Sequence, residues 1–139
     1  MQNDLSIRPV SKVAVISREI VAVLKESVGR GPTRAKTHLH DDCVLVLMRE
    51  GHTRSEGTMF EGGGSQAVVQ GRLDLSEMIR DRLVEVVERN TGRKVTGFLA
   101  SSQQHPDLIS FVFVFAPSPP PEEGDEIDAV PSGLSRPDA

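Results

Sequence analysis

The stretch Leu108–Phe115, which reads Leu-Ile-Ser-Phe-Val-Phe-Val-Phe, is the sequence feature that most restricts the fold. Successive side chains of a strand point to opposite faces of a sheet. Here one face would carry an isoleucine and three phenylalanines, and the other a leucine, a serine and two valines. Both faces are apolar, which predicts a strand in the interior of a sheet. Either both faces pack within one core, or one is buried against a second copy in a homodimer.

The spacing of apolar residues predicts two long helices. The first carries apolar side chains at steps of three and four residues from Val13 to Val28, and Gly29 then occupies a left-handed cap position. The second begins between residues 65 and 74 and ends at Thr91-Gly92. A short helix over residues 56–61, ended by three glycines, is also predicted. The inward-facing residues of the second long helix are Leu75, Ile79, Leu83, Val86 and Val87.

Three further strands complete the predicted sheet. Residues 34–40 alternate as a half-buried strand does, and a tight turn at 40–42 leads into residues 43–48, which are apolar on both sides. Residues 95–100 form a strand, and residues 101–107 form the turn before the last strand. The predicted fold class is α+β, with a four-stranded mixed or antiparallel sheet of two hairpins, two main helices packed on one face, and the order α-β-β-(α)-α-β-β.

Composition divides the chain into three parts. The 139 residues leave room for one core. Residues 117–139 hold six of the nine prolines, six acidic side chains and one basic one, and such a segment cannot offset its chain entropy by burial. We therefore expect a flexible N-terminus at 1–9, an α+β domain at 10–116 and a disordered tail at 117–139.

Charge and hydropathy exclude several classes of protein. Residues 1–116 carry 14 acidic and 15 basic side chains, so the domain lacks the basic field of a non-specific nucleic-acid binder. No apolar run approaches the ~20 residues that cross a bilayer, which predicts no direct membrane insertion. The lone Cys43 lies in an apolar run, which favours a buried, reduced thiol. A cytoplasmic location follows.

The stretch from Gly29 to Asp42 is the densest in chemically active side chains. On a strand, its alternate residues would share one face, with two aspartates at the end of that strand. The cluster could hold an anion or a metal, but the pattern favours the solvent-facing polar residues of a half-exposed strand over a metal site. No catalytic set, cofactor or metal site is predicted. The candidate ligand- or partner-binding residues are Arg30, Arg34, Lys36, His38, His40, Asp41 and Asp42.

Motifs in the predicted domain resemble the MpsC-like family, over roughly residues 10–116. They are Ser17-Arg-Glu-Ile20, Gly29-Arg-Gly-Pro-Thr33, Ala35-Lys-Thr37, Leu39-His-Asp-Asp42, Thr91-Gly-Arg-Lys-Val95 and Pro106-Asp107. That bacterial family is named for a component of a sodium-translocating, membrane-potential-generating system. The chain departs from it at His38, where tyrosine is common, and at the three glycines 62–64. The resemblance implies an accessory role near sodium or bicarbonate transport.

Two functional hypotheses remain. The first is a non-enzymatic, cytoplasmic, MpsC-like accessory protein, dimeric, that binds a membrane-protein partner or a small anion. The alternative is a small metal- or anion-binding, enzyme-like domain centred on Lys36, His38, His40, Asp41 and Asp42. Convergence of these side chains in a concave pocket would favour the alternative, and splayed side chains on an open sheet the first.

Overall fold

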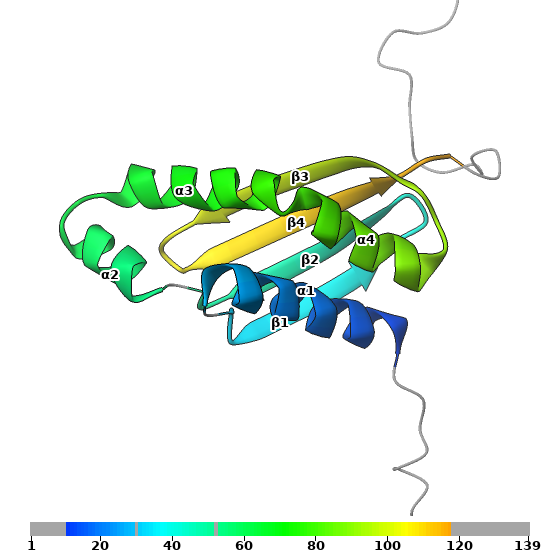
Figure 1. Ribbon diagram of the computed structural model, residues 1–139, viewed down its shortest axis with the longest axis horizontal. Coiled ribbons are helices and arrows are strands. Elements are labelled where there is room, and N and C mark those ends of the chain that lie inside the picture. Colours follow the sequence, from blue (N-terminus) through cyan, green and yellow to red (C-terminus); the bar gives the residue numbers. More distant parts are fainter. Residues whose placement is uncertain (1–10, 30, 52, 118–139) are drawn as a thin grey trace, which may run out of the picture.

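The computed structural model describes residues 11–29, 31–51 and 53–117. These residues form a layer of helices in front of a sheet (Figure 1). The predicted N-terminus at 1–9 and, apart from Pro117, the predicted tail lie outside the described residues. The elements are α1 (Lys12–Val28), β1 (Arg34–Leu39), β2 (Cys43–Arg49), α2 (Arg54–Glu61), α3 (Ser65–Met78), α4 (Arg80–Thr91), β3 (Val95–Gln103) and β4 (Leu108–Phe115).

The four strands form one antiparallel sheet in the order β1-β2-β4-β3. Each outer strand is joined to its neighbour as a hairpin, and the two hairpins meet where β2 pairs with β4. The predicted α+β class and element order are confirmed, and the sheet is antiparallel rather than mixed. The two strands with apolar residues on both faces therefore occupy the centre of the sheet.

The helix ends follow from local chemistry. The Ser11 side chain accepts a hydrogen bond from the Ala14 amide at 3.2 Å, which caps the start of α1. Gly29 ends that helix in the left-handed region at φ 82°, and Gly92 ends α4 in the same way at φ 71°. A side chain is strained at such a φ, so glycine is favoured at both positions.

The second long helix of the sequence is two helices in the structure. α3 and α4 meet at Ile79, which has φ −103° and ψ 9°. Neither glycine nor proline marks this bend, and the apolar spacing passes through it without interruption. β3 also extends to Gln103, beyond the predicted end at Ala100.

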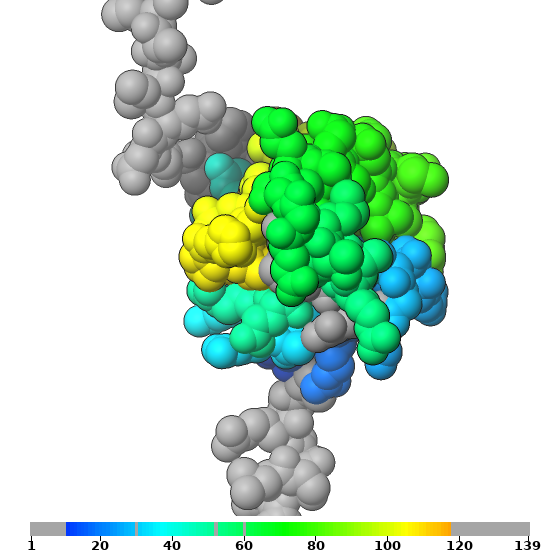
Figure 2. Space-filling model, turned by 90° about the vertical axis from the view of Figure 1, so that its left-hand side faces the viewer, coloured from blue at the N-terminus to red at the C-terminus, as the bar shows by residue number. Residues whose placement is uncertain are grey.

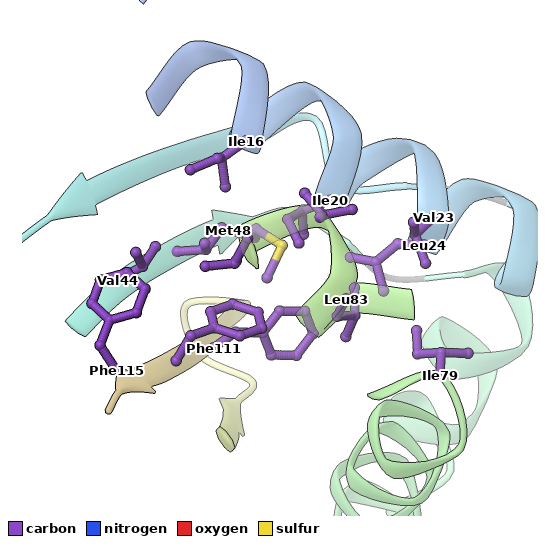
Figure 3. Close-up of a cluster of buried hydrophobic side chains, with 14 residues drawn as sticks. Ile16, Ile20, Val23, Leu24, Val44, Met48, Ile79, Leu83, Phe111 and Phe115 are labelled. Atoms are coloured by element: carbon purple, nitrogen blue, oxygen red, sulfur yellow. The ribbon is translucent and has the colours of Figure 1, made fainter. Parts of the chain in front are cut away.

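The core lies between the helices and one face of the sheet (Figure 3). Ile16 and Ile20 of α1 and Leu83 of α4 have no exposed surface, and neither has Phe111 of β4. Phe98 lies with its ring centroid 5.4 Å from that of Phe111, an aromatic contact that joins β3 to β4. A partly buried polar contact joins α1 to β1, because the hydroxyl oxygens of Ser17 and Thr37 are 2.7 Å apart.

Replacing Phe113 with alanine should lower the free energy of unfolding by about 3–5 kcal/mol, because the side chain is fully buried and its removal leaves a cavity. Urea denaturation measures the loss. The control is Met78→Ala, whose side chain is 81% exposed and should change stability by no more than about 0.5 kcal/mol. Equal effects of the two substitutions would contradict the assigned core.

Candidate functional site

The first half of the predicted binding stretch lies on β1. Thr37 is buried beneath α1, so the residues that alternate with it point to the face of the sheet away from the helices. Arg34 and Lys36 are exposed there, and His38 is half-buried. Arg30 lies outside the described residues. The strand thus places three of the predicted residues in one row.

The second half lies on the turn between β1 and β2. The His40 amide donates to the carbonyl of Cys43 at 2.8 Å, and the carbonyl of Asp42 accepts from the last amide of β4 at 2.9 Å. The carbonyl of Asp41 accepts from the Arg93 guanidinium. Backbone atoms of this turn therefore bond the β1–β2 hairpin to neighbouring elements. The side chains of His40, Asp41 and Asp42 are exposed.

The predicted residues follow the strand instead of meeting at one point. At about 3.3 Å per residue, Arg34 and His40 lie about 20 Å apart. Within the ranges that the structure describes, no group of three or more His, Cys, Asp and Glu side chains is placed to hold a metal ion. The arrangement suits an extended partner better than a single small ligand.

The register adds Arg49 to this basic row. Arg34 on β1 is directly opposite Arg49 on β2, and both belong to the helix-free face. Like charges directly opposite each other on neighbouring strands are destabilising. Neither guanidinium forms an ion pair with a described residue. Sequence reasoning missed Arg49 because the cross-strand partner depends on the register of the hairpin.

The middle of the same face is apolar. Leu45, Val112 and Leu99 are cross-strand neighbours on β2, β4 and β3, and Leu99 is 63% exposed. Leu47 and Val114 extend the apolar area along the two central strands, where both are half-buried. We call this side of the sheet the open face. Arg34, Lys36 and His38 lie along its β1 edge, and Arg49 lies at the end of β2 next to Arg34.

Cys43 also belongs to the open face, at the start of β2. It is half-buried rather than buried as the sequence predicted. Burial raises the pKa of its thiol, and the nearby carboxylate of Asp42 raises that pKa further. The thiol is therefore protonated at neutral pH, which does not suit it to act as a nucleophile.

A buried ionic cluster lies at the helix side of the sheet and was not predicted. The Arg72 guanidinium on α3 donates to the Asp107 carboxylate at 2.8 Å and to the Ser102 hydroxyl at 3.0 Å. Its Nε donates to the Glu56 carboxylate at 3.2 Å. The Arg72 side chain is 6% exposed and that of Asp107 is 8% exposed. One cation thus joins α2, α3 and the β3–β4 connection.

The local sequence holds Glu56 in position. The Thr53 hydroxyl accepts from the Glu56 amide at 3.1 Å, and the Glu56 carboxylate accepts from the Thr53 amide at 3.0 Å. This reciprocal pair is a capping box, and it begins α2 at Arg54. The Thr-x-x-Glu spacing was the available sequence signal for this helix start, two residues before the predicted one.

The electrostatics of the cluster favour a structural role. Burial lowers the pKa of the Arg72 guanidinium, but its hydrogen bonds to Asp107 and then to Glu56 raise it more, so the pKa lies above its ordinary value. The cation is therefore charged at every physiological pH. Because several donors of the guanidinium are already used, the cluster serves as a fastening between elements.

A shallow depression lies beside this cluster at the start of α3. Its lining mixes polar side chains with the apolar Ala67 and Val69, and Gln104 closes one side by donating to the carbonyl of Ser65. None of the predicted site residues lines it. The lining residues are Ser65, Gln66, Ala67, Val69, Gln70 and Gln104.

Comparison with known proteins identifies the family. Residues 11–117 match the family described as Na⁺-translocating membrane potential-generating system (MpsC), and the chain belongs to this family. No curated protein and no solved structure matched the chain. Among the helices of the described residues, none combines the length and the hydropathy needed to cross a membrane.

Replacing Arg72 with alanine should lower the free energy of unfolding by about 3–5 kcal/mol, because two carboxylates lose a buried partner. Urea denaturation followed by circular dichroism measures the loss. The matched control is Arg82→Ala, which breaks an exposed pair with Glu26 and should cost at most about 1 kcal/mol. A loss below about 1 kcal/mol for Arg72→Ala would show that the cluster does not fasten α3 to the sheet.

Proposed function

We propose that this chain is a non-enzymatic accessory protein of a bacterial Na⁺-translocating, membrane-potential-generating system, linked to sodium or bicarbonate transport. It works in the cytoplasm as a homodimer and binds a membrane protein of that system. Membership of the MpsC family supports the system. The described helices include none that could span a bilayer, which supports action through a membrane-bound partner.

The pairing of Arg34 with Arg49 is the observation that carries the proposal. Two guanidinium groups directly opposite each other, with no carboxylate from the described chain between them, repel one another. A partner carboxylate placed between them would replace this repulsion with charge-assisted hydrogen bonds, for which arginine is geometrically suited. The proposed partner segment is therefore acidic and extended, and it belongs to the cytoplasmic side of a membrane protein.

The rest of the predicted stretch would orient that segment. Lys36 and His38 continue the basic row along β1, and Arg30 precedes that row in sequence. Asp41 and Asp42 lie at the other end of the strand, beside His40, and would repel an acidic segment. A charge gradient along one strand thus selects one direction of binding.

The alternative is a metal- or anion-binding, enzyme-like domain that uses Lys36, His38, His40, Asp41 and Asp42. Bicarbonate is the anion to test, because it is the one that the proposed transport role supplies. Such a site would bind the ion in the isolated protein, without any membrane partner, and titration calorimetry with bicarbonate or with a divalent cation measures this directly.

The double substitution Arg34→Glu with Lys36→Glu should reduce recovery of the membrane partner at least tenfold, because both side chains are exposed and both charges are reversed. The experiment uses the tagged full chain as bait in detergent-solubilised membranes of the native cell, with mass spectrometry of the captured proteins. Exposed charges contribute little to stability, so the variant should keep the melting temperature of the parent.

The matched control reverses two exposed charges on α1, on the other side of the molecule, by Lys12→Glu with Arg18→Glu. This control should recover the partner as the parent does. Undiminished recovery by the folded β1 variant would refute the proposed surface. Bicarbonate or cation binding that is lost in the β1 variant, with no membrane protein captured by the parent, would favour the alternative.

A further inference from the structure

The open face differs from the exposed face of an ordinary antiparallel sheet. Such sheets alternate apolar residues toward the core with polar residues toward water. Both central strands instead carry apolar side chains on the side away from the helices, including Leu45 and Leu47 on β2 and Val112 and Val114 on β4. In the end-on view of Figure 2, the helices in blue and green lie to the right, and the strands in cyan and yellow lie to the left.

The size of this face matches what a dimer needs. With strands about 4.8 Å apart and about 3.4 Å per residue, four strands of eight residues cover about 500 Å² in projection. Two such faces together cover about 1,000 Å² in projection, which reaches the lower threshold for a specific interface between proteins. The face is therefore large enough for a second copy of the same chain.

The charges on the open face select one arrangement of the two copies. All its basic side chains lie on β1 and at the end of β2, whereas β3 presents Leu99, Ser101 and Gln103, which carry no charge. Stacking β1 on β1 of the partner would bring the basic rows together. A two-fold axis that runs between β2 and β4, parallel to them, instead puts β1 across from β3 of the partner.

We infer that a second copy of this chain covers the open face, with β1 of each copy across from β3 of the other. This inference gives the arrangement of the homodimer, and it rests on the homodimer of the proposed function but not on its membrane partner. Lys36 lies in one cross-strand row with Leu47, Ser110 and Ser101. Because the axis runs along the strands, the apolar centres of the two faces meet, and Lys36 faces Ser101 of the partner subunit at the rim of the interface. Since β1 is an edge strand, the long Lys36 side chain extends to solvent there and stays accessible to the membrane partner.

The arrangement has a consequence for the membrane partner. A rotation about an axis parallel to the strands keeps each end of the sheet at the same end of the dimer. The two Arg34–Arg49 corners therefore lie side by side at one end, where their long side chains reach solvent at the rim of the interface. The dimer then presents two identical basic corners to a partner, which raises its apparent affinity without any new contact.

Analytical ultracentrifugation of the full chain tests the interface. At about 100 μM the parent should sediment at twice its chain mass of 15.1 kDa, since dimerisation follows mass action. Leu99→Lys places a charge on β3 where β1 of the partner would cover it, next to the apolar centre, and should raise the dimer dissociation constant at least 100-fold. The control is Met78→Lys, on the helix side and 81% exposed, which should leave the dissociation constant unchanged.

Chemical cross-linking tests the orientation. In a Cys43→Ser background, Lys36→Cys and Ser101→Cys are made in separate chains, and a bismaleimide of about 10 Å, the distance between packed sheets, is added. The mixture should give a cross-linked dimer containing both chains, and Lys36→Cys alone should give none. Cross-linking of Lys36→Cys to itself at equal yield would overturn the arrangement.

A parent that stays monomeric at about 100 μM, or a dimer that Leu99→Lys leaves intact, would overturn the interface itself. These readouts need no membrane partner. A confirmed dimer whose Arg34→Glu and Lys36→Glu variant still captures membrane protein would thus refute the proposed binding surface alone.

Discussion

The structure depends on a mismatch between the number of apolar sheet faces and the number of helical layers. β2 and β4 lie in the centre of the sheet and are apolar on both sides, but the described helices cover only one side. On the covered side, Phe111 and Phe113 pack into the core, and neither side chain has any exposed surface. On the other side, the same strands leave apolar residues partly in water.

The charges on the open face are also distributed unevenly. The basic residues of the open face are confined to the β1 edge and to the corner where Arg34 meets Arg49. A cross-strand pair of like charges weakens the hairpin slightly, and a fold shaped only by stability would have little use for it. The Arg93 guanidinium, by contrast, lies 4.2 Å from the ring of Phe115 and donates to the carbonyl of Asp41. The contacts of Arg93 give it a role in packing, whereas the role that we propose for Arg34 and Arg49 is recognition of a partner.

Local sequence patterns predicted the helices and strands. The features that the sequence did not predict depend on contacts between residues far apart in the chain. The alternation in residues 34–40 and the apolar run 108–115 fixed the strand faces correctly, because the period of two is a local property. The bend at Ile79 was missed because it depends on where α4 must lie against α1.

The missed site residues share that dependence on distant contacts. Arg49 joins the basic row only through hairpin register. Arg72 finds its partners 16 and 35 residues away in sequence, and no spacing rule indicates such a cluster. Arg72 shares the buried side of α3 with Val68 and Ser76. The sequence does not indicate that this side is buried, because burial there depends on the position of the neighbouring strand.

The Arg72 cluster also separates segments of the fold that differ in local stability. Among the described apolar residues of α3, Val68 alone is buried and Leu75 is partly buried against the core, and Glu56 links α2 to α3 through a polar contact. A segment fastened mainly by one ionic contact can detach while the phenylalanine core stays closed. Amide protons of α2 and of the first turns of α3 would then exchange with solvent as a cooperative unit, well before those of β2 and β4. The Arg72 cluster thus holds α2 and the start of α3 at the same end of the sheet as Arg34 and Arg49.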